Sequence, residues 1–153
     1  MLSLIRSSIA LLCLALSTMF LVTGCSSIND VINAKQNGTE GTTKEYPVTQ
    51  DQAWNIAKTV LRWEGTDAIE EHRDQGYMVT STGMSIGTAG TVIGVWVEKG
   101  AAQNGTKVIV VTKRRITINA ITSLTEGTFH KRFAQGVGIV RAGKPLPLVA
   151  PNE

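Results

Sequence analysis

The chain has 153 residues, of which 42% are hydrophobic and 18% are charged, and its 15 Lys and Arg exceed its 12 Asp and Glu by a net charge of +3. This length fits one domain of ordinary size, and so small a positive excess is not the footprint of a nucleic-acid-binding protein. The two cysteines are Cys13 and Cys25. The rest of the chain therefore has no disulfide framework, and its fold must depend on a hydrophobic core.

Residues 1–24 have the three-part layout of a secretory signal peptide. Arg6 and the free amine form a short positive region, residues 9–22 form an apolar run, and Thr23 and Gly24 are small. A transmembrane helix is the alternative, but it needs about 20 apolar residues, and this shorter run lacks a basic stop-transfer cluster. We expect residues 1–24 to be removed, which leaves 129 residues with 14 Lys and Arg and 12 Asp and Glu, a net charge of +2.

Val22, Thr23, Gly24 and Cys25 resemble the lipobox of bacterial lipoproteins, in which an aliphatic residue, a small residue and Gly or Ala precede a cysteine. The resemblance implies that the Cys25 thiol receives a diacylglycerol group, that a peptidase cuts between Gly24 and Cys25, and that the new amine is acylated. Several acyl chains anchor a protein stably, whereas one chain binds only marginally. Because Ser26 stands where Asp would favour the inner membrane, the resemblance implies the periplasmic face of the outer membrane.

Residues 25–44 are rich in Gly, Thr, Ser, Asn and charged side chains, and their main apolar residues are Ile28, Val31 and Ile32. This composition cannot bury enough surface to fold alone. The sequence therefore predicts a lipidated flexible tether, in which a short helix can form at 28–34. A flexible chain of this length places the domain about 25 Å from the bilayer.

The folded domain is predicted to span 45–140 and to open with a helix over 49–64. Thr49 and Gln52 match a capping box, in which each side chain accepts a hydrogen bond from the other residue's backbone N–H. Gly65 is a natural helix stop. Apolar side chains recur between these points at the spacing of one helix face, namely Ala53, Ile56, Ala57, Val60 and Leu61.

Three or four antiparallel strands are predicted after this helix. Runs rich in β-branched and aromatic residues lie at 68–73, 77–82, 91–98 and 106–113. The connection between the last two contains Asn104-Gly105, a turn signal, so these two strands are expected to form a hairpin.

The last predicted element is a helix that begins with a second capping box, Ser-Leu-Thr-Glu at 123–126. Phe129, Phe133 and Val137 form one apolar stripe on it. Residues 141–153 are rich in proline and are expected to form an extended tail. The order helix, strands, helix predicts a two-layer α+β domain, with the N-terminal and C-terminal helices on one face of the sheet.

Residues 83–87 match G-x-S-x-G, the nucleophile motif of α/β-hydrolases, with Ser85 at its centre. That motif needs a helix after the serine, whereas the sequence here continues with glycines and then a strand. The family order also places an acid between serine and histidine, where only Glu98 and Glu126 precede His130. We favour a flexible inter-strand loop, with a small hydrolase as the alternative.

Other ligand-binding patterns are weak. The glycine-rich loop lacks the Lys-Ser/Thr ending of a phosphate-binding loop. His72 and His130 have no second histidine or carboxylate at the spacing of a metal site. We therefore expect no catalytic residue, no cofactor and no metal.

Lys113, Arg114 and Arg115 form a basic run at the end of the last strand. Such a run is usually a solvated strand end, but it can also contact anionic lipid headgroups or an acidic partner. On 91–98 both alternating sets of side chains are apolar, as in a strand buried on both faces. With both helices on one face, Trp96 on the other is expected to meet the Pro-rich tail, the loop 83–90, a second copy or a partner.

The segments Tyr-Pro-Val-Thr-x-Asp-x-Ala-Trp at 46–54 and Gly-Thr-Lys-Val at 105–108 resemble a group of small bacterial lipoproteins that carries no established activity. The similarity covers about residues 45–113. The leading hypothesis is a non-enzymatic, lipid-anchored envelope protein that binds another envelope protein or its own copies, and no nucleic acid. The alternatives are a hydrolase using Ser85 and a carrier of a small apolar ligand.

Overall fold

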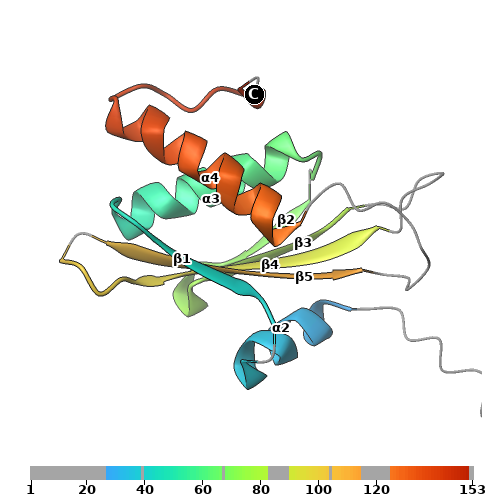
Figure 1. Cartoon of the computed structure of the whole chain (residues 1–153). Helices are drawn as coiled ribbons and strands as arrows, with labels where there is room; N and C mark the ends of the chain where they lie inside the picture. Colours follow the sequence, from blue (N-terminus) through green and yellow to red (C-terminus); the bar gives the residue numbers. More distant parts are fainter. Residues whose placement is uncertain are drawn as a thin grey trace, which may run out of the picture.

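The structure, a computed structural model, describes residues 27–38, 40–66, 68–82, 90–103, 105–114 and 125–151. Within these ranges the chain forms three α-helices, five strands and one short 3-10 turn, η2, in the order α2, β1, α3, β2, η2, β3, β4, β5, α4. The predicted α+β class is confirmed. In Figure 1 the sheet lies between helices α3 and α4 on one face and helix α2 on the other.

The strands of the described chain form one antiparallel sheet in the order β1-β5-β4-β3-β2. Its centre is the predicted hairpin of β4 (Thr91–Lys99) and β5 (Thr106–Arg114), in which Val95 lies opposite Val110. On one side follow β3 (Tyr77–Ser81) and then β2 (Ile69–His72), and on the other side β1 (Thr42–Tyr46) pairs with β5.

The prediction of three or four strands was wrong, because it missed β1. Four of the five β1 side chains are exposed and only Tyr46 is buried, so no apolar alternation marks this strand. Its position follows instead from long-range pairing, with Thr43 opposite Ile109 and Glu45 opposite Lys107. The position of such an edge strand is determined mainly by pairing with its neighbour, and not by an apolar pattern of its own.

Helix α3 (Gln50–Trp63) confirms the predicted opening helix and its capping box. The Thr49 hydroxyl accepts a hydrogen bond from the Gln52 backbone N–H at 3.2 Å, and the Gln52 side-chain oxygen accepts one from the Thr49 N–H at 3.0 Å. The buried side chains of α3 form a single stripe against the sheet and α4. They are Ala53, Trp54, Ile56, Ala57, Val60 and Leu61.

Helix α4 (Glu126–Arg141) begins later than predicted and extends beyond Val137, the last residue of the predicted apolar stripe. Its N-cap is Thr125, whose hydroxyl accepts from the Thr128 N–H at 3.2 Å, so the predicted cap at Ser123 was wrong. Gly136 lies inside this helix, at a point where α3 packs closely against it. A Cβ at Gly136 would come within 2.7 Å of the Ile56 Cγ2 atom. Glycine thus weakens the helix locally but permits the α3–α4 contact.

The core on the α3–α4 side is continuous from helix to sheet. Phe129 and Phe133 of α4 are fully buried and pack in one cluster with the inward residues of the central strands. On β4 these are Ile93, Val95 and Val97, and on β5 they are Val108 and Val110.

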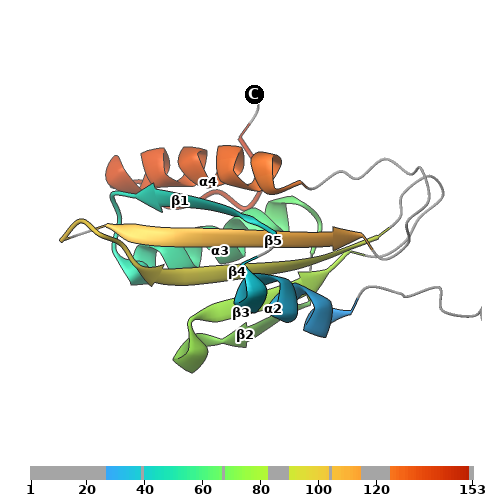
Figure 2. The ribbon, with the colours of Figure 1, turned by 60° about the horizontal axis from the view of Figure 1, so that its bottom comes forward.

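The stretch 25–44 was predicted to be a flexible tether in which a short helix can form at 28–34. The structure has helix α2 (Ile28–Asn37) and most of β1 there, so this part of the chain belongs to the fold. Val31 and Ala34 of α2 are buried against the opposite face of the sheet, in one cluster with Val92, Trp96 and Val111. Figure 2, turned to bring this face forward, shows α2 lying across the sheet. The low apolar content of the stretch was misleading, because two small apolar side chains suffice when a preformed apolar surface receives them.

Candidate interaction surfaces

The sheet face beneath α2 is the surface for which the sequence predicted a missing cover. Trp96 of β4 points away from α3 and α4, as assumed, but it is only 5% exposed. It packs with Val31 of α2, and its ring stacks at 5.9 Å between centroids with Tyr77 of β3. The expectation that the Pro-rich tail, a second copy or a partner covers Trp96 is therefore corrected: α2 of the same chain covers it.

Ion pairs lie at the edge of this covered face. The Lys35 ammonium of α2 lies 2.8 Å from Glu98 Oε1 and 5.8 Å from the centroid of the Trp96 ring. Lys107 of β5 lies 2.7 Å from the other Glu98 oxygen, and hydrogen bonds from Lys107 and Lys35 lower the pKa of Glu98. Each such partly exposed pair contributes at most about 1 kcal/mol. Together they fix the orientation of α2 more than they determine its stability.

The predicted basic run is divided between paired and exposed side chains. Lys113 forms an ion pair with Glu40, in the connection between α2 and β1, at 2.5 Å. Arg114, at the end of β5, is exposed. Arg115 lies outside the described residues, as do Gly24, Cys25 and Ser85, so their predicted roles stay predictions.

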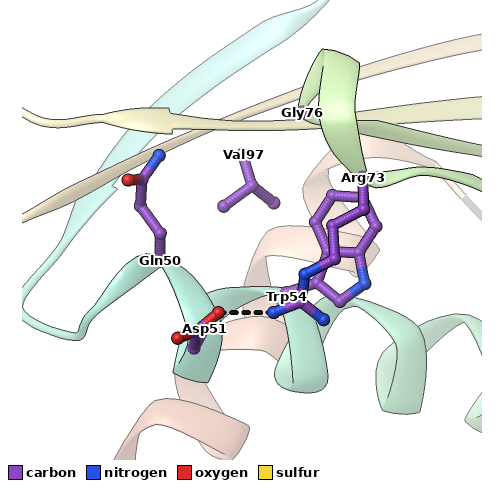
Figure 3. A pocket seen from close by; sticks show the side chains of 6 residues that line it. All are labelled: Gln50, Asp51, Trp54, Arg73, Gly76 and Val97. Carbon is purple, nitrogen blue, oxygen red and sulfur yellow. Dashed lines mark hydrogen bonds and ion pairs between the residues drawn. The ribbon is translucent and has the colours of Figure 1, made fainter.

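A pocket of about 200 Å³ lies between the first turns of α3 and the turn η2 (Arg73–Gln75). Figure 3 shows Arg73 from η2 reaching over the ring of Trp54 toward Asp51. The Arg73 Cζ atom is 5.4 Å from the ring centroid, and the guanidinium forms an ion pair with Asp51. The remaining lining residues are Gln50, Gly76 and Val97.

The polar groups around this pocket are engaged with one another. The Trp54 Nε1–H donates to Glu71 Oε2 at 2.8 Å, and Lys58 forms an ion pair with the same carboxylate. Hydrogen bonds from Lys58, first, and from Trp54 lower the pKa of Glu71. These contacts hold β2 and η2 against α3. An anion that binds to the Arg73 guanidinium has to compete with the Asp51 carboxylate for it. Sequence reasoning missed it because Asp51 and Arg73 stand 22 positions apart.

His130 and Tyr46 form a buried polar contact between α4 and β1. The Tyr46 hydroxyl lies 2.9 Å from His130 Nδ1 and 3.2 Å from the His130 carbonyl oxygen, while His130 Nε2 lies 3.3 Å from the Thr42 carbonyl oxygen. A carbonyl only accepts, so Nε2 carries the proton and Nδ1 accepts from Tyr46. Burial raises the pKa of Tyr46 to about 12 and lowers the pKa of His130. Both groups are held neutral inside the core, which suits a structural role.

The C-terminal segment 144–151 folds back over the helices and presents two apolar side chains outward. The Trp63 Nε1–H donates to the Pro147 carbonyl at 2.9 Å, and Arg132 Nη1 donates to the Pro151 carbonyl at 2.8 Å. Between these two points Leu148 is 97% exposed and Val149 is 78% exposed.

The sequence matches no protein-family model and no curated protein. Among the described helices, none has the length and apolar content needed to cross a membrane. Within the described ranges there is also no cluster of three or more His, Cys, Asp or Glu side chains arranged to hold a metal ion.

Proposed function

We propose that the protein is a lipid-anchored component of the cell envelope, on the periplasmic face of the outer membrane, that acts as a non-enzymatic binding module. The anchor is the diacylglycerol on Cys25, and the basis for it is the lipobox pattern that ends at this residue after an apolar run. The binding surface is the C-terminal segment over α3 and α4.

The observation that carries the binding role is the exposure of Leu148 and Val149 on a segment that is held at both ends. Trp63 and Arg132 hold the flanking carbonyls, and the half-buried Leu146 packs against the α3–α4 core. Because the prolines and these contacts already restrict the segment, a partner that binds the exposed pair pays little additional conformational entropy. Two neighbouring apolar side chains that are held outward on a restrained segment can insert into an apolar pocket of a partner and lose their exposure to water there.

The charge around this segment favours a partner of defined chemistry. The residues from 127 to 151 include four Lys and Arg and no Asp or Glu, and of these Arg132 is paired with Glu64 at 3.5 Å. Arg141 and Lys144 among them are exposed. The matching surface is an apolar pocket bordered by carboxylates, on another envelope protein, because complementary charge speeds and orients encounter.

The carrier alternative requires space between the helices and the sheet. That region is occupied by fully buried side chains, which include Phe129, Phe133 and Ile56. A shallow hollow of about 280 Å³ beside Tyr46 and Pro47 is smaller than typical small-molecule sites of about 300–1,000 Å³. These features support the binding module over the carrier.

Photo-crosslinking in living cells tests the proposal. A photoreactive amino acid is introduced at Leu148 in the full-length chain, and as a control at the exposed Gln36 on α2, on the opposite face of the sheet. We expect a discrete protein adduct at position 148 that is absent at position 36 and that disappears when Val149 is replaced by Asp. Equal adducts at both positions, or no adduct at 148, would contradict the binding role of the tail.

Metabolic labelling with a palmitate analogue tests the anchor separately. Cys25→Ser should leave an uncleaved precursor that takes up no palmitate analogue, whereas Cys13→Ser should be labelled like the wild type. Equal labelling of the Cys25 variant would refute the anchor.

A further inference from the structure

Helix α2 begins almost immediately after the proposed lipid anchor. Its N-cap is Ser27, so only Ser26 separates Cys25 from the capped end of the helix. Two residues span at most about 7 Å, even when fully extended. The membrane attachment point is therefore close to the folded chain, and not about 25 Å away at the end of a flexible tether.

The start of α2 is itself well ordered by local hydrogen bonds. The Ser27 N–H and hydroxyl both donate to Asp30 Oδ2, at 2.6 Å and 3.1 Å. These hydrogen bonds, and to a smaller extent the nearby charge of Lys113, lower the pKa of Asp30. Helix α2 also contacts β5, and Figure 1 shows its first turn on the side of the sheet where β5 ends.

The helix is also part of the fold rather than an appendage. Val31 is fully buried against Trp96, and the backbone of β4 approaches α2 at Gly94 so closely that a Cβ there would come within 2.6 Å of Val31 Cγ1. The Lys35–Glu98 and Lys113–Glu40 ion pairs hold the far end of α2 and the connection that follows it.

We propose that the lipidated protein lies with one end of its sheet against the phospholipid surface that holds its acyl chains. This surface comprises the first turn of α2, where Ile28 is 36% exposed, and the end of β5, where Arg114 is exposed. An exposed aliphatic side chain and an exposed arginine at this end of the sheet suit the headgroup region, where apolar and basic groups both find partners. The inference rests on the proposed lipid anchor at Cys25.

The orientation has a consequence for the rest of the molecule. The C-terminal segment, which carries the exposed Leu148 and Val149, lies on the face of the sheet opposite α2 (Figure 1). Since Lys113 is already paired with Glu40, the contact depends mainly on the short covalent connection and only weakly on salt.

Depth-dependent fluorescence quenching tests this orientation. Once Cys25 carries lipid, the mature chain has no other thiol, so a single introduced cysteine is labelled uniquely. The lipidated protein carries a fluorophore at position 28, 114 or 148 in vesicles of phosphatidylethanolamine with a minority of phosphatidylglycerol and nitroxide-headgroup lipid. We expect several-fold stronger quenching at 28 and 114 than at 148.

A matched variant separates the short connection from other causes. About ten flexible Gly and Ser residues inserted between Ser26 and Ser27 add roughly 17 Å of reach without touching α2. Quenching at 114 should then fall to the level seen at 148. Weak quenching at 114 in the original lipidated chain, or no effect of the insertion, would overturn the inference while leaving the anchor intact. If mass spectrometry finds no diacylglycerol on Cys25, the anchor and this inference fail together.

Discussion

Gly94 of β4 lies directly beneath Val31 of α2, and the absence of a side chain at Gly94 is what lets the helix reach the sheet. A Cβ at this position would come within 2.6 Å of Val31 Cγ1 and within 2.6 Å of the Trp96 ring. Such separations are too short for carbon atoms, so either the helix or the ring has to move. One glycine thus connects the N-terminal helix to the centre of the sheet.

Gly94→Ala is expected to destabilise the fold by about 1–3 kcal/mol through overpacking. Amide hydrogen exchange should show lost protection in α2 before the rest of the chain, because α2 takes the strain. Urea unfolding measures the stability change. The control is Gly138→Ala in α4, where no atom lies within 4 Å of the new Cβ; it should be neutral or stabilising by up to about 1 kcal/mol. An unchanged α2 in the Gly94 variant would contradict the close contact.

Trp96→Asp is expected to unfold the α2 side of the protein rather than to abolish a partner contact alone. The change places a charge beneath α2 and removes an almost fully buried ring, at a cost of at least about 3 kcal/mol. Circular dichroism and urea unfolding measure it. Lys99→Asp, at the exposed end of the same strand, is the control and should stay within about 0.5 kcal/mol. A Trp96 variant of wild-type stability would show that the ring is accessible.

Elements with their own repeating pattern were predictable from the sequence. The capping box of Thr49 and Gln52, the apolar face of α3 and the β4–β5 hairpin all follow from local spacing, and the structure has them. Apolar residues on both faces of β4 also predicted that something covers Trp96. The sequence did not predict that α2 is the element that covers Trp96, because this depends on how the chain folds back in three dimensions.

The features that sequence reasoning missed are those whose partners are distant. Strand β1 has one buried side chain, so no apolar pattern predicts it. Helix α2 has two, so the sequence predicted a short helix within a tether but not its packing against the sheet. The Arg73–Asp51 pair and the Tyr46–His130 contact join residues that are 22 and 84 positions apart. The sequence shows that these side chains carry charge or can form hydrogen bonds, but only the fold determines which of them are partners.

Stability should fall as the pH drops below about 6.5, the ordinary pKa of histidine. Burial lowers the pKa of His130, so the unfolded chain takes up a proton in this range before the native protein does. The stabilisation is therefore fully present above the unfolded pKa and is lost as the pH falls toward the lower native pKa, with about 1.4 kcal/mol for each full unit of difference. Urea unfolding between pH 5 and 8 measures it.

His130→Gln is the comparison for this pH dependence, because glutamine keeps a polar side chain but does not titrate. The variant should be less stable than the wild type at pH 8, since the contact with the Tyr46 hydroxyl is impaired. The difference between the two proteins should shrink toward pH 5. A difference that stays constant over this range would indicate that His130 titrates alike in the folded and unfolded chains.

Leu146 and Leu148 stand two residues apart in the C-terminal segment, and replacing each by alanine is expected to affect different properties of the protein. Leu146 is half-buried against the α3–α4 core, so Leu146→Ala should cost about 1–2 kcal/mol of stability. Leu148 is 97% exposed, so Leu148→Ala should change stability by less than about 0.5 kcal/mol. If the exposed side chain is an interface anchor, the Leu148 variant alone should lower the affinity for the crosslinked partner, by about 1–2 kcal/mol or more. Thermal unfolding and a binding titration with that partner separate the two effects, and a Leu148 variant that binds like the wild type would assign the segment a purely structural role.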